Sequence, residues 1–128
     1  MYTLRIVLSL SVLTLISCTT EVPIEVDRFG YDYMVLEQSG YPKIISDSVH
    51  IIVSYSECPG NQEFILQSSV RESSEVDLWL FKKTAGYPCD LYVREEHIYP
   101  LPTIANGRKV FLVAPSNKRI ELPVERLQ

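Results

Sequence analysis

Few side chains in this 128-residue sequence could do chemistry at neutral pH. The two histidines are His50 and His97, and histidine alone has an unperturbed pKa near neutrality. His50 lies on the more polar face of an alternating run, where an exposed ring is the simpler interpretation. His97 closes the cluster Arg94-Glu95-Glu96-His97, which could bind a cation or a basic partner. The alternative, which we favour, is a solvated sheet edge whose charges deter aggregation.

The sequence lacks the common catalytic motifs. It contains no G-x-S-x-G elbow, phosphate-binding loop, H-E-x-x-H or paired C-x-x-C. Glu95 and Glu96 are adjacent, so in a regular strand they face opposite sides and could not act together as acid and base. We therefore expect no enzyme, no metal site and no cofactor. A small hydrolase built on His97 and one of these glutamates is the remaining catalytic alternative.

Tyrosine next to proline recurs in the expected loops. Tyr41, Tyr87 and Tyr99 each precede a proline, and tyrosine in a loop supplies contact area at low entropic cost. These tyrosines could form a binding surface together with the Arg94–His97 cluster. Ordinary packing at strand ends, with the hydroxyl reaching water, would also place tyrosine there.

The first 17 residues are predicted to be an export signal. Arg5 precedes an apolar stretch, residues 6–16, which is shorter than the roughly 20 residues of a bilayer-spanning helix. Leu15-Ile16-Ser17-Cys18 then resembles the lipobox of bacterial lipoproteins. The resemblance covers only these first 18 residues. It implies cleavage before Cys18, lipidation of its thiol and acylation of its new amine, and hence a membrane anchor.

Two details qualify this resemblance. Thr19 stands where the inner-membrane retention signal would place aspartate, which favours the outer membrane of the cell envelope. A single basic residue, Arg5, precedes the apolar stretch where two or three are usual. The alternative is an ordinary secretory signal cut near Ser17, with Cys18 incidental.

With Cys18 assigned to lipid, the remaining cysteines form an even pair, Cys58 and Cys89. An exported chain folds in an oxidising compartment, and a bridge closing a loop of this size stabilises a fold by about 3–4 kcal/mol. Redox motifs place their thiols two residues apart, and a metal site would need further ligands nearby. We therefore expect a structural disulfide.

The rest of the chain is a series of short β-rich runs separated by turn residues. Alternation is clearest in two runs, Val49-Ile51-Val53-Tyr55 and Val76-Leu78-Leu80. Another strand is expected to begin at Cys89. Its apolar parity changes across the Arg94–His97 cluster, which predicts a bulge there. Asn106-Gly107 is typical of a type I′ hairpin.

These runs define the expected architecture. Pro115-Ser116-Asn117-Lys118 predicts a compact turn between the last two strands, and eight prolines oppose long helices. We expect a mostly β fold, a small antiparallel two-sheet β-sandwich, immunoglobulin-like in type, with about seven strands. The expected organisation is a cleaved signal (1–17), the lipidated cysteine and a tether (18–28), and the sandwich (29–128). Residues 22–26 alternate and could instead add a strand.

The net charge of the chain argues against one class of partner. The chain has 12 basic and 16 acidic residues, a net charge of −4, which argues against nucleic acid as a partner. The leading hypothesis is a lipid-anchored, non-catalytic binding or accessory module of the cell envelope, with an envelope protein as a possible partner. The alternative is a periplasmic protease inhibitor that uses the loop Thr84–Pro88 beside Cys89.

Overall fold

The computed structural model describes residues 27–58, 62–87 and 89–126. Its elements are, in order, β1 Met34–Val35, β2 Lys43–Ile45, β3 Ser48–Tyr55, β4 Phe64–Glu72, β5 Glu75–Lys82, β6 Val93–Pro100, the 3-10 turn η1 Thr103–Ala105, β7 Lys109–Val113, β8 Arg119–Glu121 and β9 Val124–Glu125. The predicted signal, the predicted lipidation site Cys18, the predicted tether up to residue 26 with its alternative strand, and Pro88 lie outside the described residues.

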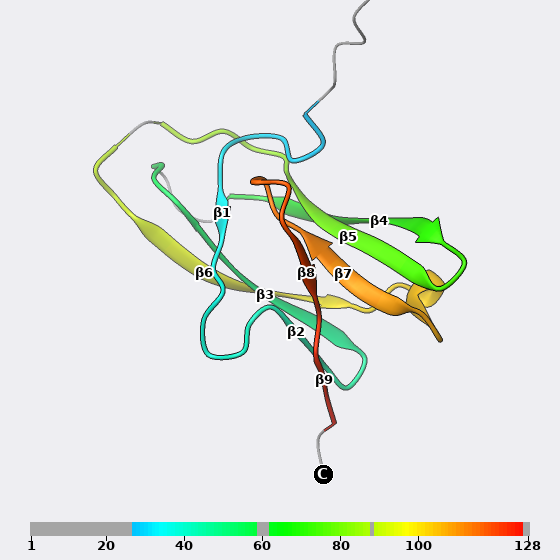
Figure 1. Cartoon of the computed structure of the whole chain (residues 1–128). Coiled ribbons are helices and arrows are strands. Elements are labelled where there is room, and N and C mark those ends of the chain that lie inside the picture. Colours follow the sequence, from blue (N-terminus) through cyan, green and yellow to red (C-terminus); the bar gives the residue numbers. More distant parts are fainter. Residues whose placement is uncertain (1–26, 59–61, 88, 127–128) are drawn as a thin grey trace, which may run out of the picture.

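The strands form two sheets that pack against each other (Figure 1). In the five-stranded sheet, β3 pairs with β6 on one side and with β1 and β2 on the other, and β9 lies beyond β2. The four-stranded sheet has the order β4-β5-β7-β8. The predicted two-sheet β-sandwich is confirmed. The described residues hold nine strands where about seven were expected. β2 is only three residues long and showed no alternation, and β8 and β9, three and two residues long, are separate strands.

Two strand pairs are parallel, which the prediction of an antiparallel sandwich missed. β2 pairs with β9 through Ile44 and Val124, and β5 pairs with β7 through Leu78 and Leu112. Parallel neighbours require a long crossover connection. In the second pair the chain leaves the four-stranded sheet after β5, builds β6 in the other sheet, and returns as β7.

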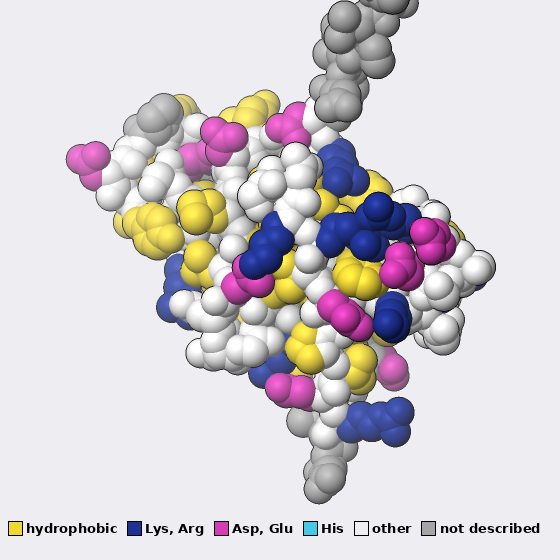
Figure 2. All heavy atoms as spheres, in the orientation of Figure 1, with side chains coloured by type: hydrophobic (Ala, Val, Ile, Leu, Met, Phe, Trp, Pro, Cys, Tyr) yellow, Lys and Arg dark blue, Asp and Glu magenta, His cyan; other side chains and the backbone are white. Residues whose placement is uncertain are grey.

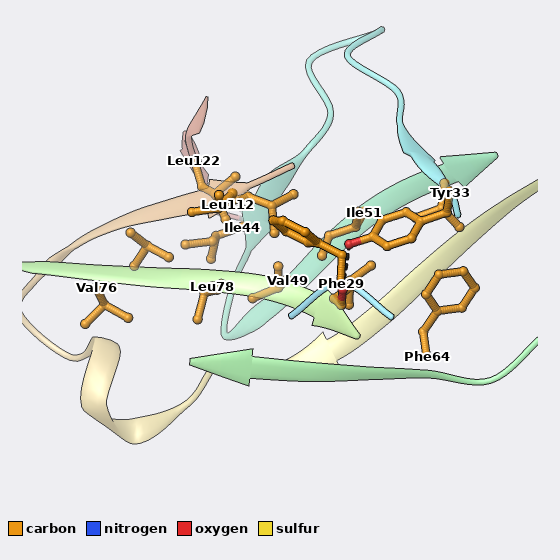
Figure 3. Packing of buried hydrophobic residues seen from close by; sticks show 14 of the residues in the cluster. Phe29, Tyr33, Ile44, Val49, Ile51, Phe64, Val76, Leu78, Leu112 and Leu122 are labelled. Carbon is orange, nitrogen blue, oxygen red and sulfur yellow. Dashed lines mark hydrogen bonds between the residues drawn. The ribbon is translucent and has the colours of Figure 1, made fainter. Parts of the chain in front are cut away.

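The core lies between the sheets, and the alternating residues fill it as predicted. Val49, Ile51, Val53 and Tyr55 of β3 are at most 4% exposed, and the β5 row Val76, Leu78 and Leu80 is at most 1% exposed. Figure 3 shows residues of both rows converging between the sheets with Phe29, Tyr33 and Phe64. Period-two burial of this kind fixes the register, because a slip by one residue would turn every apolar side chain outward.

The Asn106-Gly107 turn is not the predicted hairpin. Asn106 has φ −61° and ψ 125°, Gly107 has φ 72°, and the N–H of Arg108 donates to the carbonyl oxygen of Ala105 at 3.1 Å. These angles describe a type II turn. The flanking strands β6 and β7 belong to different sheets, so this turn redirects a crossover. The dipeptide itself fits both turn types because glycine accepts positive φ in each.

The turn at Pro115–Lys118 is confirmed. It joins the antiparallel neighbours β7 and β8, and the N–H of Ala114 donates to the carbonyl oxygen of Lys118 at 3.0 Å. Asn117 has φ 64°, a left-handed conformation that asparagine tolerates better than most residues.

The strand expected from Cys89 begins later and contains no bulge. β6 starts at Val93 and pairs with β3 without a register shift, from Val93 opposite Tyr55 to Pro100 opposite Ser48. Leu91, expected on the strand's apolar face, is 51% exposed. The parity change has another cause: Ile98 lies on the outer face and is 57% exposed, while polar Glu95 and His97 occupy inner positions.

The first described residues are held by the end of β5. The N–H of Lys82 donates to the carbonyl oxygen of Phe29 at 2.8 Å, and the N–H of Tyr31 donates to that of Lys82 at 3.2 Å. Gly30 lies between them with φ 71°, where a Cβ would collide with the Lys82 carbonyl. The described chain therefore enters the fold at one end of the sandwich, and β9 lies at the opposite end (Figure 1).

Candidate functional site

A hollow opens where β1 pairs with the end of β3. This β1–β3 cavity has a volume of about 600 Å³. Its lining combines carboxylates, hydroxyls and aromatic rings from four segments of the chain: Asp32, Tyr33, Met34, Ser54, Tyr55, Ser56, Glu57, Gly86 and Tyr92. Ligand sites in proteins commonly pair a largely apolar lining with a few polar groups that orient the ligand.

The rim of the cavity is apolar and exposed. Met34 and Tyr92 are each 61% exposed, although both are large hydrophobic side chains. Figure 2 shows hydrophobic side chains gathered on the part of the surface where β1 and the start of β6 lie. Exposed apolar side chains grouped around a hollow mark a binding surface more often than isolated ones do.

A buried hydroxyl without a partner lines the same cavity. Ser54, opposite Met34 in the β1–β3 pair, is 1% exposed, and its Oγ has no hydrogen-bond partner among the described residues. Buried polar atoms are nearly always bonded, so an unbonded one needs an explanation. A ligand or water in the cavity would supply the missing bond.

A buried ion pair supports one wall of the cavity. Lys82 is fully buried, and its Nζ donates to Glu57 Oε2 and, at 3.0 Å, to the carbonyl oxygen of Thr84. The rings of Tyr55 and Tyr31 lie 5.0 and 5.8 Å from Nζ, within the range of cation–π attraction. The buried ammonium of Lys82 thus fixes the carboxylate of Glu57 in the cavity wall.

The protonation of Glu57 follows from these contacts. Burial acts to raise the pKa of its carboxyl, but the hydrogen bonds from Lys82 Nζ and from the N–H of Gly86, together with the positive charge of Lys82, outweigh burial. The pKa of Glu57 is therefore lowered, and the cavity carries a carboxylate at neutral pH.

The loop that follows β5 is fixed at several points. Cys58 and Cys89 form the predicted disulfide, with 5.8 Å between their Cα atoms. Cys58 and Tyr87 exchange backbone hydrogen bonds, and the hydroxyl of Thr84 accepts from the N–H of Glu63 at 2.8 Å. The side chain of Tyr87 is nevertheless 74% exposed. The loop presents an exposed aromatic ring on a fixed backbone.

The Arg94–His97 cluster is divided between the two faces of β6. Arg94 and Glu96 are exposed, while Glu95 and His97 lie on the inner side. Glu96 Oε1 lies 2.9 Å from His50 Nδ1. His50 is therefore not the exposed ring that was expected, because only 14% of its side chain is accessible. The predicted separation of Glu95 from Glu96 is confirmed.

The inner half of the cluster forms a hydrogen-bonded network. Glu95 accepts from the Tyr55 hydroxyl at 2.8 Å and lies 3.0 Å from His97 Nε2. The Tyr99 hydroxyl lies 3.3 Å from His97 Nδ1. Both ring nitrogens of His97 are thus engaged, and its ring packs on Phe64 at 4.8 Å. The network joins the edges of the two sheets, beside a shallower hollow of about 450 Å³ lined by Gln62, Glu95, Glu96 and His97.

Tyr99 belongs to this network and is not a loop residue. Burial and the nearby charge of Glu95 raise its pKa to about 12. Tyr41 lies in the connection between β1 and β2, with its ring 4.5 Å from Lys43 Nζ, and Tyr87 lies in the fixed loop. Tyr41, Tyr87 and Tyr99 thus lie on three separate segments of the chain, and no contact among them is described.

Sequence reasoning missed the residues of the β1–β3 cavity. Lys82 was detectable, because it continues the buried β5 row by two residues, which is the position of a core side chain. Ser54 and Glu57 carried no such signal. Their meeting depends on β1 pairing with the end of β3 and on the loop returning through Gly86, and neither pairing leaves a pattern in the sequence.

Known proteins offer no further guide to this site. No protein-family model, curated protein or solved structure matches the chain. The described residues contain no group of three or more acidic, histidine or cysteine side chains that could hold a metal ion. Nor does the described part contain a helix long and apolar enough to span a bilayer.

Proposed function

We propose that this protein is a lipid-anchored, non-catalytic binding module of a bacterial cell envelope, and that its ligand occupies the β1–β3 cavity. One observation carries the assignment of the site: a hollow with an exposed apolar rim, formed by Met34 and Tyr92, also contains the unbonded buried hydroxyl of Ser54. The lipobox-like residues ending at Cys18 support the anchor. The Cys58–Cys89 disulfide is consistent with export.

The hydrolase alternative has less support. In a hydrolytic triad a carboxylate orients the histidine and a nucleophilic hydroxyl or thiol bonds to its other ring nitrogen. Among the described residues the His97 nitrogens bond to Glu95 and to the phenol of Tyr99, and no serine, threonine or cysteine is within hydrogen-bond distance of the ring. The carboxylate of Glu95 is shared between Tyr55 and His97. These bonds favour a structural role for the network, which closes the edge between the two sheets.

Photo-crosslinking in intact cells tests the proposed site. A photoreactive phenylalanine analogue replaces Tyr92 at the rim or, as the matched control, exposed Glu121 of β8 on the other sheet. We expect a discrete adduct from position 92 and none from position 121. The cavity-lining variants Met34→Ala and Ser54→Val should then reduce the yield of that adduct. Equal adducts from both positions, or none from position 92, would argue against a binding site here.

A second candidate function, protease inhibition, is favoured by the fixed loop. Tyr87 is 74% exposed beside a disulfide and a backbone bridge, and such preorganisation lowers the cost of binding in a protease cleft. Serine proteases with an apolar S1 pocket select large side chains of this kind. Inhibition of such a protease that is lost in Tyr87→Ala and retained in Tyr41→Ala would establish this function; no inhibition by the unaltered protein would exclude it.

A further inference from the structure

The exposed edges of the two sheets differ in how well they are protected against pairing with a strand of another chain. The β6 edge carries the charges of residues 94–97 and ends at Pro100, and β8 and β9 are only two or three residues long. Charges, proline and short length are the devices by which natural sheets avoid pairing with another chain. β4 is nine residues long, and its residues 64–70, Phe-Ile-Leu-Gln-Ser-Ser-Val, contain neither a charge nor a proline.

The backbone of β4 offers free hydrogen-bonding groups along that edge. The N–H of Lys83 donates to the carbonyl oxygen of Glu63, so odd-numbered residues here direct their backbone groups toward β5 and even-numbered residues direct theirs away. The Tyr99 hydroxyl accordingly reaches the outward carbonyl of Phe64 at 3.4 Å. The outward N–H and C=O groups of Leu66, Ser68 and Val70 have no partner among the described residues.

The stretch of β4 with unpaired outward backbone groups is bounded at both ends. Tyr99 occupies the carbonyl of Phe64 at one end, and a register irregularity between Val70 and Glu72 ends the regular ladder at the other. Three outward residues remain, and Ser68 is the middle one. A strand with this arrangement is complementary to its own copy when the copies run antiparallel about a twofold axis through Ser68.

We infer that β4 is the pairing edge of a symmetric homodimer, in which two copies of this chain join their four-stranded sheets. Leu66 then lies opposite the partner's Val70, and Ser68 lies opposite the partner's Ser68. Each outward residue both donates and accepts a backbone hydrogen bond across the axis. Val70, which is 45% exposed in the single chain, gains an apolar neighbour, and no like charges face each other within residues 64–70.

A symmetric crosslink in the full chain tests this arrangement in cells. Residues opposite each other in a hydrogen-bonded antiparallel pair have Cα atoms about 5.5 Å apart, within the range of a disulfide. Ser68→Cys should therefore give, after mild oxidation, a covalent dimer of twice the single-chain mass on a non-reducing gel. Ser74→Cys, in the exposed turn after β4, is the matched control and should remain mostly monomeric.

Light scattering on the purified protein gives an independent measurement. The unaltered chain should have the mass of a dimer that does not grow further with concentration. Ser68→Lys, which brings two like charges together at the axis, should have the mass of a single chain while its thermal unfolding stays cooperative. A monomeric unaltered chain, open-ended growth, crosslinking no better than in Ser74→Cys, or crosslinking of Ser68→Cys to a different protein would each overturn the inference.

Discussion

At the scale of single residues, breaking the Glu57–Lys82 ion pair from one side should lower the free energy of unfolding strongly. Glu57→Gln leaves the ammonium of fully buried Lys82 without its counter-charge, and breaking a buried pair from one side costs about 3 kcal/mol or more. The control Glu63→Gln removes an exposed pair with Lys83, in which both side chains are more than half accessible, and should change little. Urea denaturation of the two variants measures the difference in unfolding free energy.

The carboxylate of Glu57 should also make the free energy of unfolding depend on pH in the acid range. The pKa of Glu57 is lowered in the fold from its ordinary value of 4.5, so its contribution is complete above that value and is lost as the pH falls through the folded pKa. The stability difference between the unaltered protein and Glu57→Gln should therefore shrink as the pH is lowered below about 4.5. A difference that is unchanged with pH would contradict the assigned ion pair.

The contribution of Tyr33 to stability should be lost at alkaline pH, whereas that of Glu57 is lost in acid. Its hydroxyl donates to the carbonyl oxygen of Leu80 at 2.6 Å, and burial raises its pKa well above the ordinary value of 10. Tyr33→Phe leaves that buried carbonyl unbonded, at a cost of about 1–3 kcal/mol. Because a raised pKa stabilises the fold below the unfolded value, this difference should decline as the pH rises past 10. Urea denaturation at pH 8 and at higher pH measures both effects.

Residue patterns predicted only part of the candidate site. They identified Cys58 and Cys89 as a pair, because the count of cysteines and the export signal left no other partner. They could not identify Ser54, whose interest comes from an unbonded oxygen in the folded state. They also assigned His97 to a bulge, because its polarity hid its inner position on a regular strand.

At the scale of elements, the disulfide should stabilise the fold and fix the loop after β5. The bridge spans 31 positions, so the double variant Cys58→Ala/Cys89→Ala should lose about 3–4 kcal/mol of unfolding free energy. Protease cleavage within residues 84–87 should also become faster, because the backbone bridge between Cys58 and Tyr87 loses its support. Unchanged stability would mean that the rest of the fold already restrains these segments.

The accuracy of the strand predictions depended on strand length. β3 and β5, at eight residues each, showed their alternation clearly and form the core. β2 and β9 are three and two residues long, and their mutual pairing joins segments far apart in the sequence. The parallel pair of β5 and β7 was missed for a related reason: a turn dipeptide reports local backbone angles and not the sheet that the next strand joins.

At the scale of the whole molecule, the anchor is the proposal with the simplest test. Cys18→Ser should abolish incorporation of labelled fatty acid and shift the protein from the membrane fraction to the soluble fraction, because the acyl chains supply the membrane affinity. Cys89→Ala is a control that also removes a cysteine, and it should keep both the label and the membrane fraction. Unchanged fractionation of Cys18→Ser would contradict the lipoprotein assignment.

The parallel pair of β2 and β9 has a consequence for the order in which the chain can fold. Ile44 pairs with Val124 about 80 positions later, so this part of the five-stranded sheet cannot close until nearly the whole chain has emerged. Contacts so distant in sequence slow folding. In an exported chain this delay would be useful, because the polypeptide would remain unfolded during translocation. It would complete its sheet only after its last strand had crossed the membrane.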